Sequence, residues 1–152
     1  MGRALLALFL PFGGAVSAET LIATRSDGVV IARFPMPEGA GWCIHWRHSV
    51  QLFEVKDCYE NRGGKLVLDR SHLPDFAAGL DHIPGRGRQV SDGQGGYWIL
   101  DLNEPVPGNA YVLRPGSLKV DHRIVTPHAE VSLSAAATHD RVRIALTPDQ
   151  DP

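Results

Sequence analysis

The sequence predicts an all-β fold, an antiparallel β-sandwich or a partly closed barrel of about nine or ten short strands. Short runs of β-branched and aromatic residues alternate with clusters of Gly, Pro, Asn and Asp along the chain. In residues 141–146, Val142, Ile144 and Leu146 point one way and Arg141, Arg143 and Ala145 the other, which is typical of a half-buried antiparallel strand. Helical periodicity is nearly absent, and residues 75–80 have the length of a single helical turn.

The expected strands follow one another at short intervals, each bounded by turn residues. Residues 21–25 and 29–34 flank Ser26-Asp27-Gly28, which is a strong hairpin signal. The later strands are expected at residues 42–48, 52–60, 65–69, 97–102, 110–114, 123–126, 129–134 and 141–146. Between them, residues 84–96 hold five glycines and little that could enter a core, so this stretch is predicted to be a flexible Gly-rich loop.

The first 18 residues have the pattern of a secretory signal peptide. Arg3 supplies a positive charge, residues 4–10 are apolar, and Val16-Ser17-Ala18 places small residues at the expected cleavage site. The apolar run is much shorter than the roughly 20 residues of a membrane span. We therefore expect a single all-β domain at residues 19–152, located in the bacterial periplasm, with no membrane span after cleavage.

The charge of this mature chain argues against nucleic acid as a partner. Arg3 is the only charged residue removed with the signal, so 14 of the 15 Lys and Arg residues remain against all 17 Asp and Glu, a net charge of −3. Proteins that bind nucleic acid or anionic membranes through charge are normally basic. No cofactor-binding motif is found, and no cofactor is expected.

Two cysteines, Cys43 and Cys58, are predicted to form a disulfide across a hairpin. If these cysteines face each other, paired positions along the two strands have numbers that add to 101. The same register then pairs Arg47 with Glu54 and places Trp42 opposite Tyr59. A shift by one residue would mix the two faces of the hairpin. The disulfide is expected to contribute about 3 kcal/mol.

The segment Trp46-Arg47-His48-Ser49-Val50, followed by Glu54, resembles the bacterial family known as domain of unknown function 1850. Two further segments are similar to family motifs, Phe76-Ala77-Ala78-Gly79-Leu80 and the surroundings of His122. Gln51 departs from the pattern, since the family often has an acidic residue there. Members are small exported proteins whose genes often lie beside TAXI-type tripartite ATP-independent periplasmic (TRAP) transporters. The resemblance implies an accessory role in solute uptake, with the transporter permease or solute-binding subunit as partner.

Five residues are candidates for a binding site: Arg47, His48, Ser49, Glu54 and His122. Arg47 is suited to bind a small carboxylate through two parallel hydrogen bonds. The alternative is a purely structural role, in which Arg47 pairs with Glu54 and His48 packs in the core.

Two other functions use the same residues. A small hydrolase would use Ser49 as nucleophile with His122 as base, because adjacent residues on a strand point to opposite faces and His48 cannot serve Ser49. The sequence lacks the Gly-x-Ser-x-Gly motif that places such a serine. A metal site would combine His48, Glu54 and His122, although their spacing matches no common ligand motif. We expect neither catalysis nor a bound metal.

Overall fold

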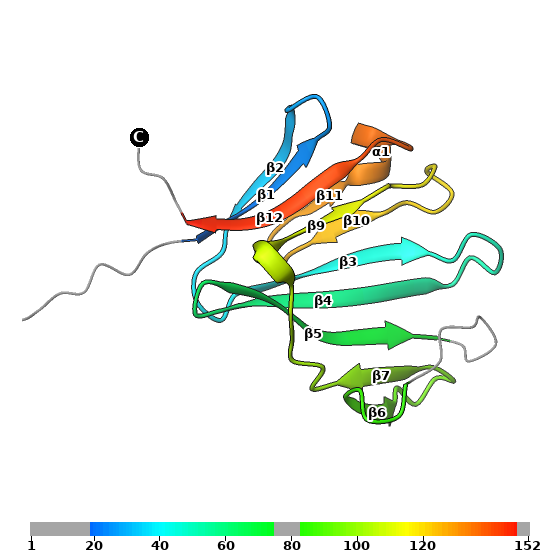
Figure 1. Cartoon of the computed structure of the whole chain (residues 1–152). Coiled ribbons are helices and arrows are strands. Elements are labelled where there is room, and N and C mark those ends of the chain that lie inside the picture. The colour runs from blue at the N-terminus through cyan, green and yellow to red at the C-terminus, as the bar shows by residue number, and fades with distance from the viewer. Residues whose placement is uncertain (1–18, 75–82, 149–152) are drawn as a thin grey trace, which may run out of the picture.

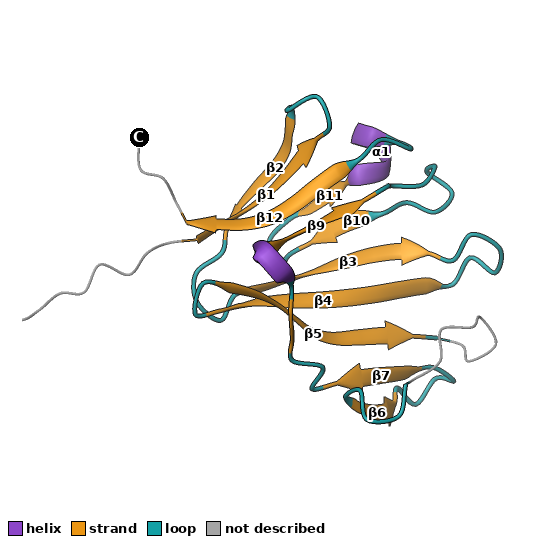
Figure 2. Cartoon of the chain, in the orientation of Figure 1, coloured by secondary structure: helices purple, strands orange, loops and turns teal. Residues whose placement is uncertain are grey.

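The computed structural model describes residues 19–74 and 83–148, which form two antiparallel sheets packed into a sandwich (Figure 1). Strands dominate the described residues, as Figure 2 shows. The expected signal peptide, residues 1–18, and the helical turn expected at 75–80 lie outside the described residues. The predicted all-β fold is confirmed as a sandwich, because neither sheet closes into a barrel.

The smaller sheet has four strands in the order β2-β1-β12-β9. These are β1 (Glu19–Arg25), β2 (Val30–Pro35), β9 (Ala110–Leu113) and β12 (Val142–Pro148). The predicted hairpin at Gly28 joins β1 to β2, and Gly28 has a φ of +88°, a backbone conformation that glycine adopts readily. In β12, Val142, Ile144 and Leu146 are buried and Arg143 is exposed as predicted, but Ala145, on the expected outer side, is buried as well.

The larger sheet has eight strands in the order β11-β10-β3-β4-β5-β7-β6, with β8 paired to β5 outside this path. Their bounds are β3 (Gly41–Arg47), β4 (Glu54–Arg62), β5 (Lys65–Leu73), β6 (Arg88–Ser91), β7 (Tyr97–Leu100), β8 (Glu104–Pro105), β10 (Arg123–Val125) and β11 (Glu130–Ser132). Two short helices complete the described part, η2 (Pro107–Asn109) and α1 (Leu133–Ala137).

Two clusters of apolar side chains form the core. The main cluster lies between the sheets and joins residues of the smaller sheet, such as Leu21 and Ile144, to Ile44 and Ile124 of the larger one. A second cluster lies on β5, β7 and the following turn, with Leu73, Tyr97, Ile99 and Leu102 as its buried members. The smaller sheet supplies no member of this second cluster, so the inner side of the larger sheet carries two separate cores.

Two predictions about individual elements are wrong. The 84–96 segment, expected to be a flexible loop, contains strand β6, which pairs with β7 through four residue pairs. All four β6 residues are exposed, so the strand has no apolar alternation from which it could be recognised. The strand expected at 129–134 ends at Ser132, whose hydroxyl oxygen accepts a hydrogen bond from the Ala135 amide and thereby caps α1.

The hairpin of β3 and β4 has the predicted register. Cys43 faces Cys58, Trp42 faces Tyr59 and Arg47 faces Glu54, and the cysteines form a disulfide. Such a bond fits a protein that folds in an oxidising compartment. No helix in the described part of the chain is long and apolar enough to cross a membrane.

Candidate functional site

Side chains of the β3–β4 hairpin alternate between two faces of the larger sheet. Trp42 and Ile44 belong to the main core and therefore define the inner face, towards the smaller sheet. The disulfide, His45 and Glu54 lie on the opposite, outer face. The five residues that the sequence singled out are divided between these faces and the hairpin loop.

Glu54 is part of an ion-pair cluster on the outer face. Its Oε2 lies 2.5 Å from Nη2 of Arg123, on the neighbouring strand β10, and its Oε1 lies 3.4 Å from Nζ of Lys56. Arg123 also contacts Glu130, with 2.8 Å between Nη1 and Oε1. The predicted pairing of Glu54 with Arg47 is correct for the backbone register but wrong for the side chains, since the Glu54 carboxylate binds Arg123 instead.

Arg47, His48 and Ser49 lie where β3 runs into the hairpin loop. The Arg47 side chain is exposed, and Ser49 is exposed within the loop. The His48 ring stacks on Phe53 with 5.1 Å between centroids, and its Nδ1 lies 3.3 Å from the amide nitrogen of Gln51, which donates to it. His48 therefore stabilises the loop and does not pack in the core, which is where the structural alternative placed it.

His122 lies on the inner face. Its ring stacks on Trp46, with centroids 6.0 Å apart and planes 4° apart. Nδ1 accepts a hydrogen bond from the Gly116 amide at 3.1 Å, and burial lowers the pKa of the ring below its usual value. The ring is therefore neutral at pH 7, and its proton is on Nε2.

The structure does not assemble the five candidates into one site. Glu54 is on the outer face, His122 is on the inner face, and His48 and Ser49 are in the loop. The base proposed for Ser49 is thus stacked on Trp46 in the interior. In the described residues, no group of three or more His, Cys, Asp or Glu side chains could hold a metal ion.

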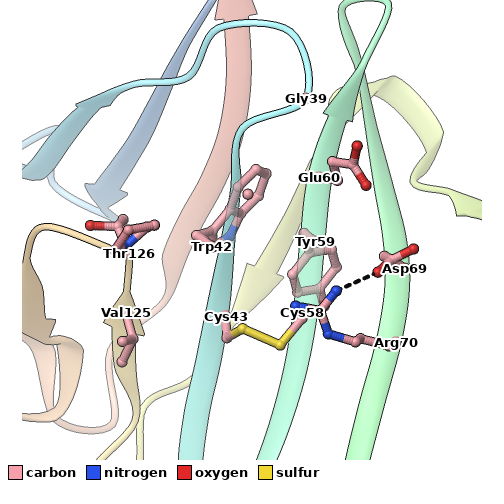
Figure 3. A pocket seen from close by; sticks show the side chains of 12 residues that line it. Gly39, Trp42, Cys43, Cys58, Tyr59, Glu60, Asp69, Arg70, Val125 and Thr126 are labelled. Carbon is pink, nitrogen blue, oxygen red and sulfur yellow. Dashed lines mark hydrogen bonds and ion pairs between the residues drawn. A yellow bond between two sulfur atoms is a disulfide. The ribbon is translucent and has the colours of Figure 1, made fainter. Parts of the chain in front are cut away.

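A hollow of about 400 Å³ surrounds the disulfide on the outer face (Figure 3). Its charged side chains are already paired, Arg70 with Asp69 inside the hollow and Glu60 with Arg62 outside it. Arg70 Nη1 lies 2.8 Å from Asp69 Oδ2, and Glu60 Oε2 lies 2.9 Å from Nη2 of Arg62. The cysteines are joined and offer no thiol. This hollow therefore presents few groups able to bind a polar ligand.

The inner face carries a different feature, a half-buried carboxylate beside two cavities. Asp57 faces Ile44 across the β3–β4 ladder and faces Ser71 across the β4–β5 ladder. Ser71 Oγ donates a hydrogen bond to Asp57 Oδ1 at 2.5 Å. Asp57 and Trp46 line both cavities, one of about 180 Å³ beside β9 and one of about 230 Å³ over β5 and β7. We call these two cavities together the Asp57 cleft.

The electrostatics of Asp57 reflect its position between the two cores. Burial raises the pKa of its carboxyl above the usual value, while the Ser71 hydrogen bond and, more weakly, the charge of Arg86 lower it. Arg86 lines the larger cavity and binds Glu104 through Nε at 2.6 Å and Nη2 at 2.8 Å. A carboxylate kept in such surroundings is a common mark of a functional site.

Asp57 was absent from the candidates, although the sequence contains a signal for it. The register through Cys43 and Cys58 places Asp57 on the same face as Val55 and Tyr59, which point inwards. A charged residue at an inner position of an apolar stripe is unusual and indicates either a buried ion pair or a site. Ser71 could not be paired with it from sequence alone, because a bulge shifts the β4–β5 register between Cys58 and Tyr59.

Comparison with known proteins places the chain in a family without assigning an activity. The family model described as domain of unknown function (DUF1850) matches residues 43–133, which is more than half of the chain. This stretch includes β3, β4 and β5, which carry the Asp57 cleft, and also His122. No curated protein and no solved structure matches the chain. The chain belongs to the DUF1850 family.

Proposed function

We propose that this protein is an exported binding module that assists a TAXI-type tripartite transporter and holds a small solute in the Asp57 cleft. The observation that carries the binding role is the half-buried Asp57 carboxylate, which is bonded to Ser71 and lines two cavities. Export is supported by the signal pattern of residues 1–18 and by the disulfide. The link to a transporter is supported by the resemblance to the family.

The shape of the cleft favours binding over catalysis. Apolar and aromatic side chains surround a small number of polar groups, which is the usual composition of a small-molecule site. Each cavity is smaller than the roughly 300–1,000 Å³ of a drug-sized site, so the solute is small or spans both cavities past Trp46. An exposed Ser49 remote from the cleft gives no support to the hydrolase alternative.

The first test is ligand binding by the full-length chain, expressed with its own N-terminal segment. Thermal unfolding is followed with C4 and C5 dicarboxylates, amino acids and small amines. A ligand at 100 times its Kd stabilises the folded state by about 2.7 kcal/mol, which gives a clear rise in Tm. Arg47 remains a candidate for carboxylate recognition, and Arg47→Ala compared with Asp57→Asn shows which residue carries the effect.

The second test concerns the partner. The chain is tagged in its native host, and the permease and solute-binding subunit encoded nearest to it are sought among the proteins that co-purify. The accessory role predicts retention of at least one of them. If neither subunit is retained and no solute raises the Tm, the proposed function is wrong.

A further inference from the structure

Aromatic rings form half of the lining of the smaller cavity of the Asp57 cleft. These are Trp46, Tyr59, Tyr111 and His122, which line it together with Asp57 and three aliphatic residues, Ile44, Val112 and Leu113. Tyr59 and Tyr111 are stacked with 5.1 Å between centroids, and Trp46 and His122 are stacked on each other. These rings come from β3, β4, β9 and the residue that precedes β10, so both sheets contribute to the wall. Aromatic faces beside a carboxylate form an environment that attracts cations.

The polar groups at this cavity make few hydrogen bonds within the described residues. The hydroxyl of Tyr111 is buried and has no hydrogen bond of good geometry there, although the side chains of Trp42 and Tyr59 are close enough to affect its pKa. Asp57 accepts a hydrogen bond from Ser71 at Oδ1, and its Oδ2 is not among the buried atoms that lack a partner in the described residues. Buried polar atoms are normally paired, and an exception calls for an explanation such as a missing ligand.

Resting on the proposed function, we infer that the cleft binds a small organic cation that carries a primary amino group. A primary ammonium has three N–H donors, which match Asp57 Oδ2 and the hydroxyl oxygen of Tyr111. Its alkyl part would lie against the ring of Trp46, where a cation gains further from the aromatic face. The cavity volume of about 180 Å³ limits the ligand to a few heavy atoms or to one that continues into the neighbouring cavity.

A dicarboxylate fits this cavity less well than an amine. Its charge would meet Asp57 inside a low-dielectric site, where repulsion between like charges is strong. Arg86 is the cation nearest to this carboxylate among the groups that affect its pKa, and Glu104 already neutralises it through two hydrogen bonds. The neutral imidazole of His122 adds no positive charge at pH 7.

The experiment measures binding of propylamine, tetramethylammonium and succinate to the full-length chain by isothermal titration calorimetry. Wild type is compared with Asp57→Asn, which keeps an oxygen for Ser71 to bond. Asp101→Asn is the matched control, because it makes the same chemical change on a residue exposed to 63%. Propylamine is expected to bind wild type and Asp101→Asn equally and to bind Asp57→Asn at least about tenfold more weakly.

Two further results bear on the inference. Tyr111→Phe is expected to weaken propylamine binding while circular dichroism shows an unchanged fold, and tetramethylammonium, which has no N–H donor, is expected to bind more weakly than propylamine. Equal binding of propylamine to wild type and Asp57→Asn overturns the inference, as does the absence of any amine binding. If succinate binds and propylamine does not, the inference fails while the proposed solute-binding function stands.

Discussion

Removal of the disulfide is expected to cost about 3 kcal/mol of the free energy of unfolding. Cys43 and Cys58 are separated by 15 positions in sequence, and a closed loop of that length lowers the entropy of the unfolded chain by this amount in the loop-closure model. The folded hairpin keeps its seven β3–β4 residue pairs in either case. The loss should therefore arise mainly in the unfolded state, which becomes less restricted.

The assay is urea unfolding of the oxidised protein and of the Cys43→Ala/Cys58→Ala double variant. In thermal unfolding of a domain of about this size, 1 kcal/mol corresponds to a few degrees in Tm. A loss of 3 kcal/mol therefore predicts a fall in Tm of roughly 10 °C. The m-value should rise slightly, because the unfolded chain exposes more surface once the bridge is gone. Wild type treated with a reductant is the matched control, since it lacks the bond but keeps both side chains.

Two outcomes would refute this reasoning. A loss of less than 1 kcal/mol with an unchanged m-value would mean that the bridge does not restrict the unfolded chain. Free thiols at both cysteines in protein isolated from its native compartment would mean that the bond does not form there. The second outcome would also remove the disulfide as support for export.

Three further predictions concern the Asp57 carboxylate, the ion pairs of Glu54 and the His48 loop. Asp57→Asn should stabilise the protein at pH 7 by about 0.5–2 kcal/mol. The folded state raises the pKa of the Asp57 carboxyl, so the charged carboxylate present above that pKa destabilises the folded protein, and asparagine removes this charge. Urea unfolding should show a smaller gain at pH 4, where more of the carboxyl is protonated. Arg123→Ala should cost about 0.2–1 kcal/mol, because Glu54 loses its shortest ion pair and keeps the longer contact to Lys56. Arg47→Ala should change stability by less than about 0.5 kcal/mol in the same assay. His48→Ala should loosen the hairpin loop, seen as faster amide exchange at Gln51, and leave propylamine affinity unchanged.

Much of the sandwich could be predicted from the sequence because most of its strands have one buried face. All ten expected strands are present, and the Cys43–Cys58 pair was sufficient to fix the register of the central hairpin. The elements that were missed lack this signal. β6 is fully exposed, and β8 has two residues, of which the second is Pro105.

The candidate site was harder to predict because it depends on strands far apart in sequence. Glu54 was paired with Arg47, its neighbour across the hairpin, whereas its actual partner Arg123 comes from β10. His122 was named as a candidate binding residue, and its contact with Trp46 of β3 could not be deduced from local pattern. Contacts between non-adjacent strands require the sheet order, which sequence alone did not supply.

A comparison of Asp57 with the buried Asn61 favours binding over folding as the explanation of Asp57. Asn61 is fully buried, and its side chain donates to the Met36 carbonyl and accepts from the Gly64 amide, so it satisfies backbone groups that would otherwise lack partners. Asp57 bonds to a single side-chain hydroxyl and satisfies no backbone group in the described residues. Burying a carboxylate costs free energy unless its oxygens are paired. The Asp57 side chain instead lines a cavity together with aromatic rings, where a ligand cation would supply a further partner.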